Sequence, residues 1–151
     1  MVGRPKLMAL ASGGGHWVEL MRLRPAFDDF ETVYVSMFDN YADQLNGARL
    51  YVIPDASRFN LLGFFPIFWK ALRIVARERP QAMVTTGSAP MLAFILLGRI
   101  LGCRTLWIDS IANSEHLTSS GRLARKFAGK VISQWPDVAQ KEGVDYWGGV
   151  V

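Results

Sequence analysis

The chain has 151 residues, of which half are hydrophobic and a fifth are charged, and its formal net charge is +4. This length and composition exclude a disordered chain and match one domain, residues 1–151, with a buried core. The single cysteine excludes internal disulfides, and with only two histidines beside it we expect no metal or other cofactor. The modest charge, without a run of Lys or Arg, argues against nucleic-acid binding and fits an anionic membrane surface at least as well.

The first third of the chain alternates strand and helix signals. An apolar run predicts a strand at Lys6–Ala11, and a glycine-rich turn leads into an amphipathic helix at His16–Arg24. On that helix we expect the charged side chain of Glu19 to face water. Further strands are predicted at Thr32–Ser36, which is rich in β-branched and aromatic residues, and at Leu50–Ile53.

The same alternation continues to the C-terminus. A long helix is predicted over Leu61–Glu78, and a shorter one over Met91–Leu101 follows Pro90. A polar loop then leads to a helix that ends near Ala128, and a short last helix opens at Trp135-Pro136. The strands between these helices are Ala82–Thr86, Arg104–Asp109 and Val131–Gln134.

Strands that alternate with helices predict an α/β fold, with one parallel sheet covered by helices on both faces in a Rossmann-like domain. In such folds the ligand crevice lies at the carboxyl ends of the strands. The polar segments that follow the first, fourth and fifth strands should therefore converge. These segments are Ser12–His16, Thr85–Ser88 and Asp109–Asn113.

The glycine-rich turn is the first candidate binding site. Three successive glycines let the backbone approach a ligand closely, and the start of the following helix favours a phosphate. The turn is not a dinucleotide site, because the third glycine of that pattern is replaced by Val18, and it lacks the lysine of a P-loop. The alternative is a tight turn without a ligand. The candidate substrate-binding residues here are Ser12, Gly13, Gly14 and Gly15.

His16 is the candidate catalytic residue, because a histidine at the mouth of the crevice can act as a general base. The alternative is a helix-start histidine that only makes local hydrogen bonds. Thr86, Gly87 and Ser88 form a second candidate anion site, or simply cap the next helix. His116, by contrast, we expect to be a surface or capping residue.

Asp109 and Asn113 complete the candidate substrate site. Asp109 ends an apolar strand, where a carboxylate could orient a sugar hydroxyl or a histidine. The equally good alternative is an aspartate that caps a loop or helix.

The segment 59–74 combines four phenylalanines and a tryptophan with basic residues, and its apolar stretch is too short to span a bilayer. Such a helix can lie in the membrane interface. The alternatives are packing on the sheet or contact with a protein partner. The candidate membrane-contact residues are Leu61, Leu62, Phe64, Phe65, Phe68, Trp69, Lys70 and Arg73.

Four motifs occur in order along nearly the whole chain, at residues 12–16, 80–87, 101–110 and 127–135. The ordered set resembles the acceptor-binding, membrane-associated subunit of two-subunit GT-B glycosyltransferases. That group includes PssD-like exopolysaccharide proteins and the anchoring subunit of the N-acetylglucosamine transferase that builds dolichol-linked oligosaccharide. The set is also similar to the N-terminal domain of the peptidoglycan N-acetylglucosamine transferase.

The resemblance implies one half of a GT-B enzyme that binds a polyprenyl-diphosphate-linked acceptor in exopolysaccharide or capsule synthesis. A separate donor-binding subunit would form a heterodimer with it and hold the nucleotide sugar. The resemblance places the protein peripherally on the cytoplasmic face of the inner membrane. Many relatives carry an N-terminal transmembrane helix and a glutamate after the fifth strand, whereas this chain lacks such a helix and has Asp109.

Three functional hypotheses follow. In the first, the chain contributes His16 as base and is a catalytic glycosyltransferase subunit, without a metal if helix dipoles and the partner stabilise the leaving nucleotide. In the second, the chain is a non-catalytic subunit that tethers and activates a catalytic partner. The third, a stand-alone nucleotide-binding enzyme, predicts tight nucleotide binding by the isolated chain.

Overall fold

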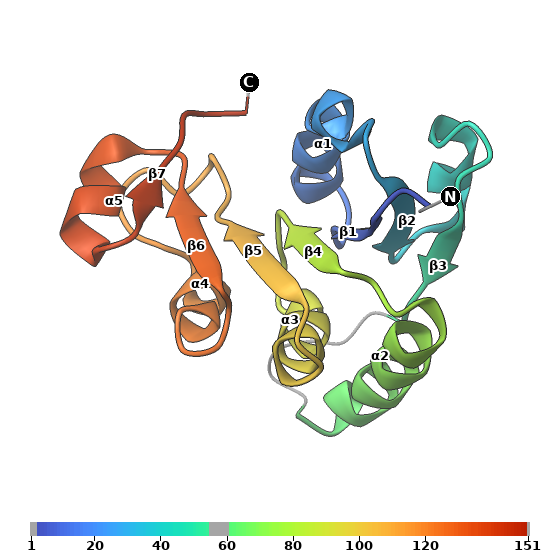
Figure 1. Ribbon diagram of the computed structural model, residues 1–151. Helices are drawn as coiled ribbons and strands as arrows, with labels where there is room; N and C mark the ends of the chain where they lie inside the picture. The colour runs from blue at the N-terminus through green and yellow to red at the C-terminus, as the bar shows by residue number, and fades with distance from the viewer. Residues whose placement is uncertain (1–2, 55–60, 151) are drawn as a thin grey trace.

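The computed structural model describes residues 3–54 and 61–150. Within these residues seven strands form one parallel sheet, in the order β3-β2-β1-β4-β5-β6-β7 (Figure 1). The predicted fold class, an α/β domain with a parallel sheet, is confirmed. The strands are β1 (Lys6–Leu10), β2 (Glu31–Ser36), β3 (Leu50–Val52), β4 (Ala82–Thr85), β5 (Arg104–Ile108), β6 (Lys130–Ser133) and β7 (Asp145–Tyr146).

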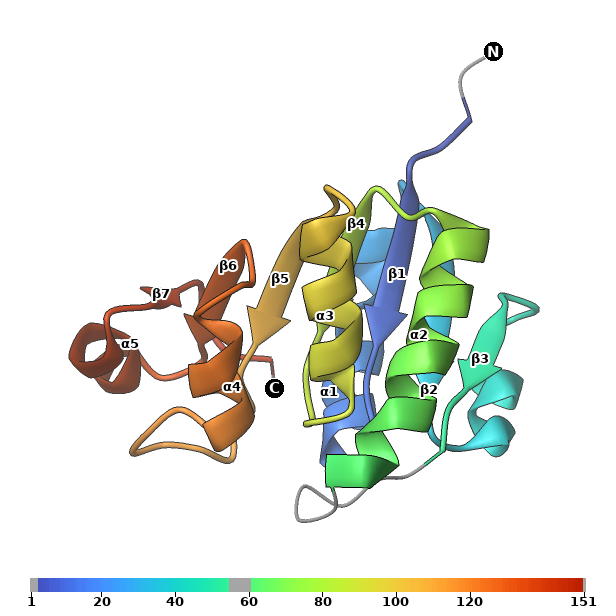
Figure 2. The same ribbon diagram turned by 90° about the horizontal axis from the view of Figure 1, so that it is seen from below.

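Helices cover both faces of the sheet. Helix α1 lies on one face, and α2, α3 and α4 lie on the other (Figures 1 and 2). The α-helices are α1 (Gly15–Arg22), α2 (Phe64–Glu78), α3 (Met91–Ile100), α4 (Ser119–Ala124) and α5 (Pro136–Glu142), and short 3₁₀ helices are η1 (Arg24–Phe27), η2 (Asp39–Gln44) and η3 (Leu61–Gly63).

The central strand β1 separates two hydrophobic cores. Its side chains alternate between the faces of the sheet, as strand geometry requires. Met8 and Leu10 belong to the core beneath α2 and α3, whereas Leu7 and Ala9 belong to the core beneath α1. Burial on both sides explains why this strand is a continuous apolar run.

Helix α2 buries only one of its faces. Ile67, Ala71, Ile74 and Val75 are buried at helical spacing and pack in the core that α2 shares with α3. The helix ends at Arg79, which takes a left-handed conformation with φ of 48° before Pro80. Among the described helices none is long and apolar enough to cross a membrane.

The strand order reverses between β1 and β4. The chain runs outward from β1 through β2 to β3, crosses over through α2, and returns to place β4 on the other side of β1. The loops that follow β1 and β4 therefore diverge to opposite faces, and a crevice forms between them. This switch point is where the sequence places His16 and Thr86.

Several predicted boundaries were wrong. The strands predicted to end at Ala11, Ile53, Thr86, Asp109 and Gln134 all end one residue earlier. The helix predicted to reach Ala128 stops at Ala124, and the one predicted from Leu61 begins with a 3₁₀ turn. Strand β7 was not predicted, because two residues are too few to show an alternating pattern.

Candidate functional site

Aromatic side chains pack against the first glycine of the glycine-rich turn, whereas Gly14 and Gly15 are exposed. A Cβ on Gly13 would lie 2.5 Å from the ring of Phe38, and the Gly14 amide donates a 3.1 Å hydrogen bond to the Tyr41 hydroxyl. Gly14 adopts φ of 55°, a conformation that favours glycine. The Tyr41 ring stacks in turn on Trp17, with ring centroids 4.3 Å apart. Gly13 therefore has a packing role and Gly14 a conformational one.

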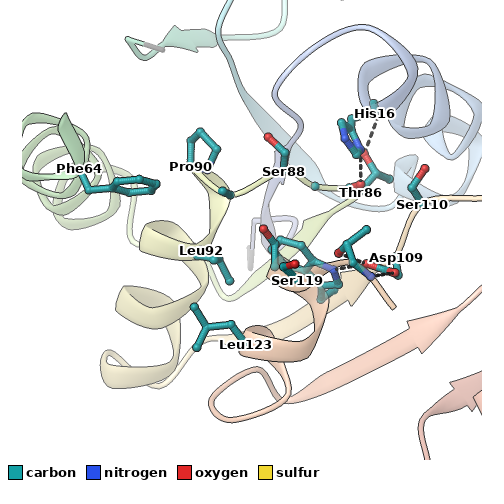
Figure 3. A pocket seen from close by; sticks show the side chains of 15 residues that line it. His16, Phe64, Thr86, Ser88, Pro90, Leu92, Asp109, Ser110, Ser119 and Leu123 are labelled. Atoms are coloured by element: carbon teal, nitrogen blue, oxygen red, sulfur yellow. Dashed lines mark hydrogen bonds between the residues drawn. The ribbon is translucent and has the colours of Figure 1, made fainter. Parts of the chain in front are cut away.

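His16 is anchored to the loop that follows β4. Its Nδ1 lies 2.8 Å from the carbonyl oxygen of Thr86. A carbonyl only accepts hydrogen bonds, so Nδ1 carries a proton, and Nε2 is the proton acceptor of the neutral tautomer that fits this contact. The Thr86 hydroxyl returns a 2.6 Å bond to the carbonyl oxygen of His16 (Figure 3).

Gly87 allows the His16 ring to pack directly on the backbone. It has φ of 115°, and a Cβ there would lie 2.9 Å from two atoms of the His16 ring. Any larger residue would be strained and would displace the imidazole. The position therefore requires glycine for two independent reasons.

A cavity of about 650 Å³ opens beside His16, between the ends of β4 and β5 and the starts of α1, α2, α3 and α4. Its polar part includes hydroxyl groups and the imidazole, and its apolar part extends toward α2 (Figure 3). The lining residues are His16, Phe64, Thr86, Gly87, Ser88, Ala89, Pro90, Leu92, Trp107, Asp109, Ser110, Thr118, Ser119, Ser120 and Leu123.

Asp109 holds the start of α4 against the cavity. Its Oδ2 accepts a 2.8 Å bond from the Thr118 amide, and its Oδ1 accepts bonds from the Thr118 hydroxyl at 2.7 Å and the Trp107 indole at 3.1 Å. The Thr118 hydroxyl also caps α4 by accepting from the Gly121 amide. This geometry matches the capping alternative for Asp109.

Glu19 is 4% exposed, so the prediction that it faces water was wrong. Its carboxylate accepts hydrogen bonds from the loops that follow β5 and β6. Donors more than 90 residues away in sequence replace the water that would hydrate this carboxylate on an isolated amphipathic helix. The sequence pattern of α1 carries no sign of them.

The structure brings together some predicted site residues and separates others. His16, Thr86, Gly87, Ser88 and Asp109 all line the cavity. Ser12, Gly13, Gly14, Gly15 and Asn113 are not among its lining residues. Sequence reasoning missed Thr118 and Ser119, although a threonine followed by serines is a helix-start signal that could have found them.

Most of the predicted membrane-contact residues are exposed on α2 and just before it. Leu62, Phe65, Phe68 and Trp69 have exposed fractions of 75%, 71%, 38% and 63%. The basic side chains of Lys70 and Arg73 are exposed beside them. Phe64 differs, because its ring lines the cavity (Figure 3). The side chain of Leu61 lies outside the described residues, as do Phe59 and Asn60.

No protein-family model matches the chain. Its sequence is 25% identical over 166 aligned residues to the UDP-N-acetylglucosamine transferase subunit ALG14 of Yarrowia lipolytica, covering 91% of this chain and 76% of that protein. The subunit of the same name from Eremothecium gossypii is 32% identical over 78 residues, covering 48% of this chain and 35% of that protein.

The fold is similar to that of MurG from Acinetobacter baumannii, with a TM-score of 0.70 at 16% identity. The match covers 89% of this chain and 43% of the MurG chain, so this chain spans less than half of that protein. It corresponds to the N-terminal Rossmann-like half of GT-B glycosyltransferases. The sequence is thus similar to glycosyltransferase subunits and the fold to half of a GT-B protein, whereas the exopolysaccharide context stays a prediction.

Proposed function

We propose that the chain is the acceptor-side subunit of a glycosyltransferase and acts with a partner chain that binds the nucleotide-sugar donor. Two findings support the proposal. The curated relatives are by name subunits of a UDP-N-acetylglucosamine transferase, and the fold corresponds to one of the two halves of a GT-B enzyme. A donor site would then form where the partner faces the carboxyl ends of the strands.

The observation that carries the acceptor assignment is the mixed character of the cavity. One part presents His16, Thr86, Ser88 and Ser119, which can bind sugar hydroxyls and a diphosphate. The other part is lined by apolar residues that include Phe64, Leu92 and Leu123. A polyprenyl-diphosphate-linked sugar has the same two chemistries in one molecule, so we assign it as the substrate class. An exopolysaccharide or capsule precursor is such a molecule.

The exposed face of α2 would hold this subunit at the membrane surface where that acceptor resides. Phe65 and Trp69 provide apolar area for the interfacial region, and Lys70 and Arg73 provide positive charge for anionic lipid headgroups. The cavity begins at Phe64, at the start of the same helix. A lipid chain could therefore pass from the bilayer into the site. We propose a peripheral location, on the cytoplasmic face of the membrane.

Tethering and activation of a catalytic partner is the role that the named relatives favour, because they are called subunits of a transferase. A further role for His16 as general base is favoured by the Nδ1–Thr86 hydrogen bond, which leaves Nε2 able to accept a proton. In that step Nε2 takes the proton of the acceptor hydroxyl, whose oxygen bonds to the anomeric carbon. The bond from that carbon to the nucleoside diphosphate breaks, and the diphosphate leaves with the electron pair.

The test is sugar transfer from radiolabelled UDP-N-acetylglucosamine to a polyprenyl-diphosphate-linked sugar in anionic vesicles. The donor-binding partner is assayed alone, with this chain, and with its His16→Ala variant. We expect little transfer by the partner alone and restoration by this chain. If His16 is the base, His16→Ala lowers turnover by about 10²–10⁴-fold.

Near-normal turnover with folded His16→Ala would leave only the tethering role. Unchanged transfer when this chain is added would overturn the proposed function altogether.

A further inference from the structure

Glu19 is a buried carboxylate on the same helix as His16, and it does not line the cavity. Its two oxygens accept three hydrogen bonds. Oε1 accepts from the Ile111 amide at 2.9 Å and from Gln134 Nε2 at 2.6 Å, and Oε2 accepts from the Ser110 hydroxyl at 3.3 Å. Burying a carboxylate is costly, and these three donors compensate for the lost water.

The three donors belong to two loops, which follow strands β5 and β6. Ser110 and Ile111 follow β5, and Gln134 follows β6. Gln134 Nε2 is shared with the carbonyl oxygen of Asp109 at 2.9 Å, and its Oε1 accepts from the Val150 amide at 2.7 Å. Glu19 thus connects α1 to a network that also holds the cavity wall near Asp109.

Glu19 and His16 are three positions apart, and residues at this spacing lie on one face of a helix. His16 anchors the first turn of α1 to the loop after β4, and Glu19 anchors the next turn to the loops after β5 and β6. Trp17 adds a 3.1 Å bond to Gln44 Oε1. An eight-residue helix is only marginally stable by itself, so such anchors determine its rotation.

We propose that Glu19 is a positioning residue, which fixes the rotation of α1 so that His16 Nδ1 stays on the Thr86 carbonyl and Nε2 stays free for the acceptor. The consequence for sugar transfer rests on the proposed function. The effect on the imidazole does not, and it can be measured on the isolated chain.

The pattern of donors predicts which substitutions are tolerated. A glutamine at position 19 keeps one oxygen for Ile111 and Gln134, and its amide can donate to the Ser110 hydroxyl. An alanine removes all three acceptor contacts and leaves buried donors unpaired. Glu19→Gln should therefore preserve the position of His16, and Glu19→Ala should not.

The experiment records two-bond ¹H–¹⁵N NMR correlations of the imidazole at alkaline pH, where the ring is neutral. His116→Gln supplies the background, because His116 is exposed and its removal leaves His16 as the one histidine of the sequence. We expect protonated Nδ1 and bare Nε2 in the background protein and in Glu19→Gln. In Glu19→Ala the ratio of the two tautomers should shift by about tenfold toward protonated Nε2, the change expected for one net hydrogen bond.

Glu78→Ala is the matched control, because Glu78 is as buried as Glu19 but lies at the C-terminal end of α2. It should lower stability without changing the tautomer ratio. An unchanged ratio in Glu19→Ala, or an equal shift in Glu78→Ala, would overturn the proposal.

If Glu19→Ala does not fold, Gln134→Ala replaces it, since this change removes the shortest of the three bonds and keeps the carboxylate. A partial shift toward protonated Nε2 is then expected, and a spectrum like that of the background protein contradicts the proposal. If the unaltered chain fails in the transfer assay, the proposed function is contradicted. The expected tautomer ratio of His16 is not affected by that result.

Discussion

Glu19 and Glu78 are both buried, yet they lie at opposite ends of the sheet and are held by different kinds of group. Glu19, at the carboxyl ends of the strands, accepts bonds from an amide side chain, a backbone amide and a hydroxyl. Glu78 is bound by Lys6 at 3.1 Å, by the Tyr51 hydroxyl at 2.5 Å and by Arg49. Helix α2 runs from the cavity end to the Glu78 end (Figure 2).

The contrast indicates that Glu78 mainly stabilises the fold, whereas Glu19 mainly positions residues of the site. Lys6 and Arg49 neutralise Glu78 and join the beginnings of β1 and β3 to the end of α2. At the other end, neutral donors hold Glu19, and two of them, Ser110 and Ile111, belong to the loop after β5 that contributes Ser110 to the cavity lining. Changes at the cavity end should therefore affect the site more than the fold, and changes at the Glu78 end should do the reverse.

After removal of His16 itself, the largest effect on the site is expected from Gly87→Ala. The new methyl group would lie 2.9 Å from the His16 ring and would sit on a residue with φ of 115°, so the imidazole must leave Thr86. A misplacement of this size lowers sugar transfer by about 100-fold. The measurement is turnover in the reconstituted pair.

Gly102→Ala is the control for Gly87→Ala. Gly102 also has positive φ, at 82°, but a Cβ there meets no atom within 4 Å. It should lower stability by about 1 kcal/mol and leave turnover almost unchanged. Equal loss of turnover in both variants would show that backbone strain alone is responsible.

The next largest effect, on stability, is expected from Glu78→Ala. It leaves Lys6 and Arg49 without their shared carboxylate and removes the acceptor of the Tyr51 hydroxyl. Because Arg49 is half exposed, water compensates part of the loss, and we expect about 2 kcal/mol of destabilisation in urea unfolding. Turnover at saturating acceptor should stay within about twofold of the unaltered chain.

Much of the fold followed from local sequence. Apolar runs separated by amphipathic segments predicted six of the seven described strands and the switch point, because burial of both faces of a parallel sheet makes its strands continuously apolar. The same reasoning placed His16, Thr86 and Asp109 at one edge. Strand β7 was not predicted, because a two-residue edge strand is too short to show an alternating hydrophobic pattern.

The features missed at the site depend on contacts between distant parts of the sequence. Nothing near Glu19 indicates that donors from Ser110, Ile111 and Gln134 would replace water around its carboxylate. Likewise, the glycine turn was predicted to bind the substrate, but Phe38 and Tyr41 from the segment after β2 pack against its first glycine, Gly13. Whether its amides also contact the acceptor stays a prediction.

A smaller effect, on membrane binding, tests which end of the molecule faces the lipid. The double variant Phe65→Ser, Trp69→Ser removes two exposed aromatic rings from the part of α2 near the cavity. Loss of part of this apolar area should weaken binding to phosphatidylglycerol-containing vesicles by about tenfold in a flotation assay.

The matching change at the other end of the sheet is Ile100→Ser, Leu101→Ser. These side chains are similarly exposed, at 67% and 54%, but they lie at the end of α3 that points away from the cavity. Their loss should leave flotation unchanged. Equal weakening by both pairs would contradict a membrane-facing surface on α2.

The last effect is confined to acid pH, where Glu78 makes stability depend on protonation. Burial alone would raise the pKa of this carboxyl group, but bonds from Tyr51, Arg49 and Lys6 outweigh it and lower the pKa from 4.5 to about 2. A depressed pKa in the folded state contributes stability that is complete above the unfolded value of 4.5 and is lost as pH falls toward about 2. The difference in unfolding free energy between the unaltered chain and Glu78→Gln should therefore be constant near neutral pH and shrink through that acidic range. A difference that stays constant down to pH 2 would show that the carboxylate's charge contributes nothing and that hydrogen bonding alone holds this end of the sheet.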